Sequence, residues 1–223
     1  MSTYNVYDNS NAQVGGHVPI WLGKVRPIPV GGTLASAYAV AGAFYPAGTP
    51  MELKDGVATP FKGFKVKAYT TSSSNSIITV VPLFEGDAPK TSDFLQKVGA
   101  NFDATGKAWN PDAVAVNGTD PSAYDITVAT ANIDVVAEGD FLAFSSAVAE
   151  GSSKSLAAKP NYYLYNDVAI DPTAIGDERD NIQATVALVN FHGEGLLINR
   201  TPAAAVAAQM KVAVPNVIQE TRY

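Results

Sequence analysis

The sequence contains no cysteine, and this absence excludes several kinds of chemistry at once. A chain without thiols has no disulfide framework, no thiolate metal site and no cysteine nucleophile. Its two histidines, His17 and His192, are too few for a three-histidine metal site within one chain. We therefore predict a protein that is not an enzyme and that needs no cofactor and no metal.

Charged residues are also scarce, at 16% of the chain against about 25% in typical proteins. The formal net charge of -6 argues against the basic patch that is typical of nucleic-acid binding. No apolar run reaches the roughly 18 residues that a membrane-spanning helix needs. Residues 1–8 lack the basic region and apolar core of a secretory signal. We expect no nucleic-acid or membrane partner, and a protein that stays in the cytoplasm or leaves it within a larger particle.

What the chain does have is a high apolar content. Hydrophobic residues make up 47% of its 223 residues, and this combination with low charge indicates a folded chain. The length suits one large domain or two small ones, with a hydrophobic core that needs no disulfide or metal ion to stabilise it.

Short apolar segments between turn signals predict a mostly β fold with a barrel-like or sandwich body of short strands. Residues 61–69 alternate apolar and charged side chains, which is the period of a half-buried strand. Residues 77–84 are a β-branched run that predicts a buried strand, in which Pro82 indicates an edge or a bulge. Asp55 and Gly56 favour a tight turn. Further strands are expected at 124–128, 133–136, 141–144, 162–170, 184–191 and 196–198, and 184–191 is the best candidate for a buried one.

Residues 85–125 differ from the rest because turn-forming residues punctuate them throughout. We expect a loop-rich excursion there, in which residues 91–98 could form a short helix. If the body divides into two subdomains, this excursion places the boundary near residue 85 or near residue 125.

One helix is predicted near the C-terminus. Thr201 can cap it and Pro202 can be its first residue. The alanine-rich sequence that follows favours a helix to about Val212, and Pro215 ends it.

The first 30 residues are predicted to form an extended N-terminal arm, which precedes a β-rich body over residues 31–223. Three prolines between residues 17 and 30 forbid a helix there. Apolar side chains along this segment suit contact with a capsid or another partner: Val18, Ile20, Trp21, Leu22, Ile28 and Val30. An equally supported alternative is that Ile20, Trp21 and Leu22 cover the core of their own chain.

Candidate catalytic groups do not converge. The serines at 72–74 and 152–153 lie in loop-like sequence and lack the Gly-x-Ser-x-Gly context of a nucleophile. The charged run 177–180 is interpreted as a solvated loop rather than as paired catalytic carboxylates. We therefore assign no catalytic residue.

Two other groups of side chains were weighed as binding sites. The acidic sets Asp134, Glu138, Asp140 and Asp167, Asp171, Asp177 do not match the 12-residue calcium loop, so no metal site is predicted. Tyr162, Tyr163 and Tyr165 could stack on a sugar, although alternating strand packing explains them more simply.

Three segments carry a resemblance to a known class of proteins. They are residues 44–50 (Phe-Tyr-Pro-Ala-Gly-Thr-Pro), residues 55–60, and residues 184–189 with the helix at 202–212 that follows. In these segments the chain resembles the head decoration, or capsid-stabilising, proteins of tailed phages, some of which form head fibres. Members of that class carry an apolar-Pro-Ala-Gly-Thr turn, matched here by Pro46, Ala47, Gly48 and Thr49, and they combine a strand-rich body with a late helix.

The resemblance implies a structural virion protein that is made in the host cytoplasm and lies on the outer surface of the capsid. It implies a homotrimer, with the major capsid protein as partner and the N-terminal arm against the shell. Two alternatives remain at this point. One is a phage tail, baseplate or fibre module that binds host-surface glycans or proteins, and the other is a β-rich enzyme in which replacing His192 would abolish turnover.

Overall fold

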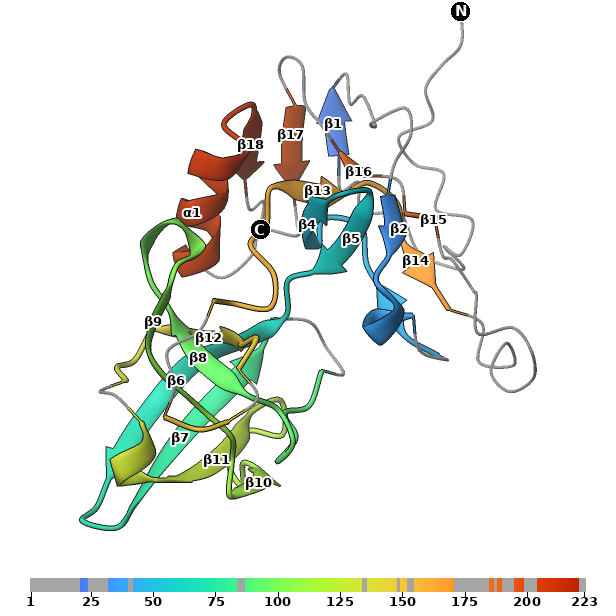
Figure 1. Cartoon of the computed structure of the whole chain (residues 1–223). Coiled ribbons are helices and arrows are strands. Elements are labelled where there is room, and N and C mark those ends of the chain that lie inside the picture. Colours follow the sequence, from blue (N-terminus) through green and yellow to red (C-terminus); the bar gives the residue numbers. More distant parts are fainter. Residues whose placement is uncertain are drawn as a thin grey trace, which may run out of the picture. The chain divides into compact units, whose positions relative to one another are not determined.

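A computed structural model describes residues 21–23, 32–39, 42–83, 87–133, 136–147, 149–151, 155–170, 185–186, 188–189, 195–198 and 204–220. Across these residues the protein is mostly β with one α-helix near the C-terminus, as the sequence predicts (Figure 1). The chain divides into two compact units. The first unit comprises Met1–Pro60, Pro160–Pro202 and Met210–Tyr223, and the second comprises Phe61–Lys159 and Ala203–Gln209.

The first unit contains a six-stranded sheet. Its strands, in spatial order, are β15 (Thr185–Val186), β2 (Gly32–Leu34), β5 (Val57–Pro60), β4 (Pro50–Lys54), β13 (Tyr162–Leu164) and β16 (Leu188–Val189). The β2–β5 pair is parallel and the other pairs are antiparallel. No pairing between β15 and β16 closes this sheet into a barrel in the described part of the chain.

The turn between β4 and β5 shows why Asp-Gly predicts a hairpin. Asp55 has φ 52° and Gly56 has φ 80°. Two consecutive positive φ angles are the requirement of the two-residue turn whose twist matches the flanking strands. This sequence prediction is therefore confirmed.

The first unit has its own hydrophobic core, formed by Leu34, Tyr45, Met51, Ala58, Leu164 and Ile170.

The apolar run 184–191 was expected to form one buried strand, and this expectation is wrong. The run contributes β15 and β16, which occupy the two ends of the six-stranded sheet. β15 pairs with Gly32 and Thr33, whereas β16 pairs with Tyr163 and Leu164. An apolar run carries no signal for the point where a chain changes partner, because both strands require the same residue types.

Two smaller sheets complete the first unit. β3 (Phe44–Tyr45) pairs with β14 (Val168–Ala169). β17 (Gly195–Ile198) lies between β1 (Trp21–Gly23), which is antiparallel to it, and β18 (Val217–Glu220), which is parallel to it. The helix α1 (Ala204–Ala213) connects β17 to β18, as a parallel pair requires a crossover. Pro215 follows its end, as predicted, whereas Thr201 and Pro202 lie outside the described residues.

The second unit contains a seven-stranded antiparallel sheet (Figure 1). Its strands, in spatial order, are β10 (Ala113–Val116), β11 (Tyr124–Ala129), β7 (Asn75–Pro82), β6 (Gly63–Thr71), β12 (Phe141–Phe144), β8 (Leu95–Val98) and β9 (Ala104–Trp109). The described residues also include three short 3-10 helices: η1 (Ser36–Tyr38), η2 (Ala100–Phe102) and η3 (Thr130–Asn132). The order leaves β10 and β9 as the two edges of this sheet.

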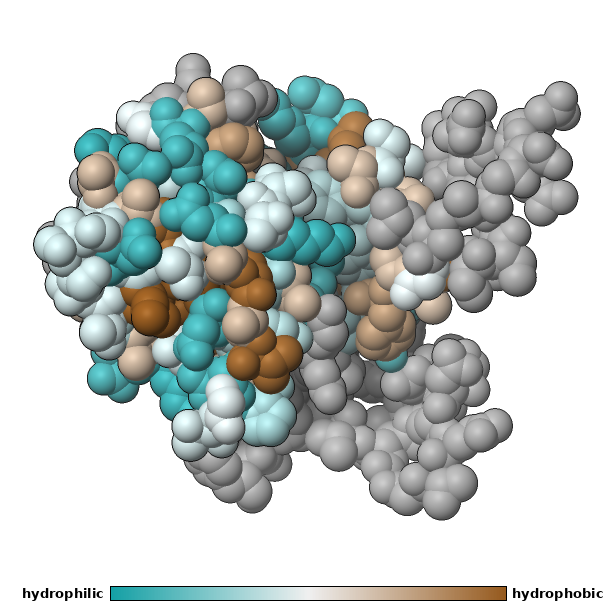
Figure 2. Space-filling model, turned by 90° about the horizontal axis from the view of Figure 1, so that it is seen from below, coloured by the Kyte–Doolittle hydropathy of each residue, from teal (hydrophilic) through white to brown (hydrophobic). Residues whose placement is uncertain are grey.

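Most large apolar side chains of the described residues are buried. The exposed ones are Phe44, Val57, Ile77, Val116 and Val212. Among the residues coloured in the view from below, the apolar ones lie in separate spots between polar ones (Figure 2).

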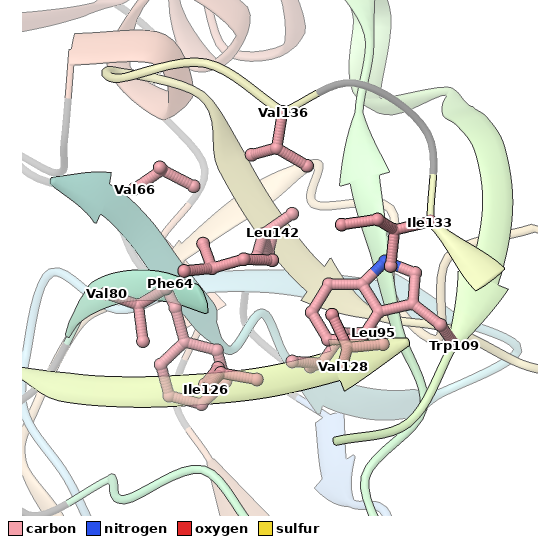
Figure 3. Packing of buried hydrophobic residues seen from close by; sticks show 11 residues of the cluster. Phe64, Val66, Val80, Leu95, Trp109, Ile126, Val128, Ile133, Val136 and Leu142 are labelled. Carbon is pink, nitrogen blue, oxygen red and sulfur yellow. The ribbon is translucent and has the colours of Figure 1, made fainter. Parts of the chain in front are cut away.

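One face of the seven-stranded sheet carries the core of the second unit (Figure 3). Eleven buried residues form it: Phe64, Val66, Ile78, Val80, Leu95, Trp109, Ile126, Val128, Ile133, Val136 and Leu142. Several of them alternate along β6, β7 and β11, as the period of 2 in residues 61–69 predicts. On β12, Phe141 stacks on Phe61 with ring centroids 5.7 Å apart.

Residues 85–125 are more regular than predicted. Strands β8, β9 and β10 and the start of β11 lie within them, so the expectation of a loop-rich excursion is wrong for much of this segment. The short helix expected at 91–98 is absent from the structure, which has β8 there. Leu95 pairs with Trp109 and Phe144, so partners distant in sequence decide the conformation. Asp93 instead makes a turn, in which its carboxylate accepts the Lys90 N–H at 2.8 Å and burial raises its pKa.

Pro82 was expected to mark an edge or a bulge, but it is the last residue of the central strand β7. Its missing N–H costs no bond toward β11, because that pairing extends only to Val80. The bulge of this hairpin lies in β6, where Val66 pairs with Val80 and Ala68 with Thr79, so that Lys67 is the extra residue.

Candidate functional site

The turn that carries the resemblance, Pro46 to Thr49, is buried in the first unit between β3 and β4. Tyr45, Ala47 and Thr49 are each at most 5% exposed. The Thr49 N–H donates to the Pro46 carbonyl at 3.1 Å, and Gly48 has φ 85° at the third position of the turn. This is the φ that a type II turn needs, and glycine adopts it at little cost.

Bonds from other segments hold this turn in place. The Asp167 carboxylate accepts the Ala47 N–H at 2.6 Å, and the Gly48 N–H donates to the Leu164 carbonyl at 2.8 Å. The Leu164 N–H in return donates to the Thr49 carbonyl at 2.8 Å. The motif therefore joins β4 to β13 through hydrogen bonds within the first unit.

The arm residues proposed for partner contact are described only in part. Val18, Ile20, Ile28 and Val30 lie outside the described residues. Trp21 and Leu22 lie on β1, where they pair with Leu197 and Leu196 of β17. The backbone of this short stretch thus belongs to a sheet of its own chain, and contact of the arm with a partner stays a prediction.

Most residues weighed for catalysis also lie outside the described ranges: His17, His192, the run 177–180 and the serines 152–153. Ser72 is described and lies in the turn of the β6–β7 hairpin. Its hydroxyl donates to the Asn75 carbonyl at 2.8 Å and accepts the Asn75 N–H at 3.1 Å. These local bonds close a turn, and they place no general base beside the hydroxyl.

The acidic sets give no cation site in the described part of the chain, where no three His, Cys, Asp or Glu residues gather. Asp140 accepts the Ala137 N–H and the Lys97 ammonium, each at 2.7 Å. Gly139 has φ 89° in the same turn, so Asp140 serves the turn before β12. Asp134, Asp171 and Asp177 lie outside the described residues.

The tyrosines weighed for sugar stacking are not a free aromatic platform. Tyr163 is fully buried in β13, and Tyr162 packs against the core of the first unit. The interpretation as alternating strand packing therefore fits both residues better.

A polar cluster in the β10–β11 loop was missed at the sequence level. The Asn117 side-chain amide donates to both carboxylate oxygens of Asp125 at 3.0 Å, and Asp125 accepts the Thr79 hydroxyl at 2.7 Å. The Asn117 side-chain oxygen also accepts the N–H groups of Thr119 and Asp120 at 2.9 Å. The Asn-Gly-Thr-Asp-Pro sequence signals such a turn, but it does not identify Asp125 or Thr79 as partners.

Buried polar side chains on the sheets are also satisfied. Gln96 is fully buried on β8, where its amide donates to the Gly106 carbonyl at 2.8 Å and accepts the Ser145 hydroxyl at 2.9 Å. Ser76 is buried on β7 and lies 3.0 Å from the Thr130 hydroxyl. Satisfied groups of this kind specify strand register, and they offer no reactive atom.

Comparisons with protein-family models, with curated proteins and with solved structures found no match. Within the described residues, no helix is long and apolar enough to cross a membrane.

Proposed function

We propose that this chain is a structural virion protein that binds the outside of a tailed-phage capsid and stabilises or decorates it as a homotrimer. The observation that carries the proposal is the segment Phe44 to Pro50. Its sequence resembles the apolar-Pro-Ala-Gly-Thr turn of head decoration proteins, and its backbone forms a buried, hydrogen-bonded turn in a strand-rich unit. A helix near the C-terminus, α1, agrees with the same resemblance.

The chemistry of the described residues supports a structural role. The side chains of Ser72, Asp140 and Asp167, which were candidates for catalysis or cation binding, bond to backbone groups of turns and loops. An active site would instead bring titratable groups together around a reacting atom.

The N-terminal segment supplies the contact with the shell in this proposal. Ile20, Ile28 and Val30 each follow a proline in the sequence, and prolines at this spacing disfavour a helix. Burying apolar area at this contact contributes about 25 cal/mol per Å² to the binding free energy. The loss of conformational entropy when the segment becomes ordered opposes this gain. Many copies on one shell add avidity to a modest contact.

The first experiment is the mass of the purified protein by light scattering after size exclusion. The proposal expects about three times the chain mass of 23.3 kDa. A stable dimer or a mass of another multiplicity would contradict the trimer. A monomer would restrict the proposal to a protein that assembles only on its shell.

The second experiment tests capsid binding. Shells assembled from the major capsid protein of the same genome are mixed with the full chain or with a chain lacking residues 1–30, and sedimented through sucrose. The full chain should co-sediment in a saturable amount, and the truncated chain should lose most of its binding. A Gly118→Ala variant, altered at an open position of the second unit, serves as the matched control that should still bind. Failure of the full chain to sediment with the shells would overturn the proposal.

A further inference from the structure

Asn117 is followed by Gly118, and no other asparagine of the sequence precedes a glycine. The backbone nitrogen that follows an asparagine can attack the Cγ atom of its side-chain amide and close a five-membered succinimide ring. Glycine favours this step, because it has no Cβ to obstruct the approach and its backbone rotates freely. Gly118 is exposed, and a Cβ atom there would meet no other atom within 4 Å. The attacking nitrogen therefore lies in an open part of the loop.

Four hydrogen bonds hold the Asn117 amide in the folded chain. Its nitrogen donates to both carboxylate oxygens of Asp125 at 3.0 Å. Its oxygen accepts the N–H groups of Thr119 and Asp120 at 2.9 Å. The Asn117 backbone N–H also donates to the Ala123 carbonyl at 2.9 Å, which fixes the main chain beside the amide. An amide held at both its oxygen and its nitrogen has little freedom to turn toward the residue that follows it.

Asp125 opposes ring closure for a chemical reason as well. Negative charge develops on the amide oxygen as the backbone nitrogen attacks, and a carboxylate this close raises the energy of that charge. The amide nitrogen must also leave as ammonia, so both of its bonds to Asp125 must break first. The carboxylate is itself held in place, because it accepts the Thr79 hydroxyl of β7 at 2.7 Å. The pairing of β11 with β7 thus keeps Asp125 on the amide.

We propose that Asn117 is a deamidation site that Asp125 keeps closed while the loop between β10 and β11 is folded. When the loop opens, the Gly118 nitrogen forms a bond to Cγ of Asn117. The Gly118 proton passes through solvent to the side-chain nitrogen, and the bond from Cγ to that nitrogen breaks as ammonia leaves. Water then cleaves the ring at Cγ or at the backbone carbonyl carbon, which leaves aspartate or isoaspartate at position 117. Water is the only other reactant.

The product no longer fits the folded loop. A carboxylate at position 117 has no N–H to donate to Asp125, and two carboxylates at this separation repel each other. Isoaspartate also lengthens the backbone by one carbon at the end of β10. The modified loop therefore does not return to its original bonds, and the modified fraction reports how long the loop has been open. This proposal does not depend on capsid binding.

The test follows deamidation of the purified full chain in mildly alkaline buffer over weeks. Mass spectrometry of the peptide that contains Asn117 detects the mass gained when NH2 is replaced by OH. The reaction should be at least about tenfold faster in urea than in native buffer, because the bonds to a charged group are then already broken. Gly118→Ala should lose most of the reaction in urea. Asn75, which precedes the buried Ser76, is the internal reference that should keep its amide in native buffer.

Asp125→Ala tests the carboxylate in the folded chain. It removes both acceptors of the amide nitrogen, so Asn117 should deamidate about tenfold faster than in the unaltered chain, well below the melting temperature of the variant. Asp112→Ala is the matched control. It removes an exposed carboxylate at the other end of β10 and leaves the bonds of Asn117 in place, so it should react at the unaltered rate. If D125A does not fold, Asp125→Asn keeps one acceptor oxygen and should give an intermediate rate.

A destabilised variant separates opening of the loop from unfolding of the whole unit. Ile78→Ala weakens the core that contains β7 and does not touch the loop, so it should accelerate deamidation less than D125A does. The proposal fails if Asn117 keeps its amide in urea, or if the folded chain reacts as fast as the chain in urea. It also fails if folded D125A or D125N reacts no faster than D112A, or if I78A reacts as fast as the Asp125 variant.

Discussion

Lys67, the extra residue of the β6 bulge, places its ammonium 2.8 Å from the Asp120 carboxylate in the loop between β10 and β11. The bond from Lys67, with further bonds from Ser122, lowers the pKa of Asp120 from 3.8 to about 2. A bulge directs a side chain out of the regular alternation of its strand. Here it connects a long hairpin to the loop that follows the edge strand.

This ion pair predicts a specific acid dependence of stability. A carboxyl whose pKa is lower in the folded state stabilises the fold above its unfolded pKa, and this contribution is lost as the pH falls through the folded value. The window here extends from about pH 4 to about pH 2. Asp120→Asn should remove that part of the acid-induced drop in melting temperature. The measurement is the melting temperature of both proteins at pH 5, 4, 3 and 2.

The control for this prediction is Lys67→Met, which removes the partner and keeps the apolar stem. Its acid dependence should lie between those of the wild type and D120N, because the bonds from Ser122 to Asp120 remain, and the double variant should match D120N. The effect should shrink in high salt, because both groups are exposed enough to be screened. Equal acid dependence in wild type and D120N would show that the pair contributes nothing.

Neighbouring isoleucines on β7 provide a matched test of the core. Ile78 is fully buried in the core of the second unit, whereas Ile77 lies on the opposite face and is 45% exposed. Ile78→Ala should lower the free energy of unfolding by about 2–5 kcal/mol, because it removes packed atoms and leaves a cavity. Ile77→Ala should cost less than about 1 kcal/mol. Urea unfolding of both variants measures the difference. Similar losses of unfolding free energy would contradict the assignment of Ile78 to the buried face of β7 and of Ile77 to its exposed face.

Local sequence signals predicted the elements whose causes are local. Asp55 and Gly56 gave the hairpin turn because both adopt positive φ. The alternation of residues 61–69 gave β6, because one face of that strand is buried. The helix near the C-terminus followed from its alanine content and from Pro215.

Pairings between distant residues were not predictable in this way. Leu95 lies in a strand because it pairs with Phe144 of β12 on one side and with Trp109 of β9 on the other. The sequence of residues 91–98 does not indicate which distant residues will pair with it. The same limit applies to the candidate sites. The turn signals at Asn117 were visible, but its bonds to Asp125 depend on the pairing of β10 with β11.

The backbone of the seven-stranded sheet leaves no room for a side chain at Gly63 on β6. A Cβ atom there would lie 2.2 Å from the Leu142 carbonyl and 2.7 Å from the Phe141 ring. Because the obstacle is the backbone of β12, it cannot move aside cheaply. Gly63→Ala should cost about 1–3 kcal/mol, as for overpacking in other cores.

Gly118→Ala is the matched control, since no atom lies within 4 Å of the Cβ position. It should change stability by no more than about 0.5 kcal/mol. Gly139→Ala separates space from backbone strain. Its position is open but has φ 89°, so we expect a loss of about 1–2 kcal/mol. Thermal and urea unfolding give all three values, and a neutral G63A would show that β12 lies further from β6.

The Asp167 carboxylate and the buried Ala47 N–H provide the last prediction, because they test whether the resembling turn serves the fold. Asp167→Ala leaves that N–H without its acceptor and should cost about 1–3 kcal/mol, whereas Asp167→Asn keeps an oxygen in place and should cost less. Asn166→Ala, at an exposed neighbouring position, should have little effect. If the turn acts only through the fold, D167N chains that remain folded should bind shells like the unaltered chain. Weakened binding by folded, stable D167N would instead place this turn in the contact with the shell.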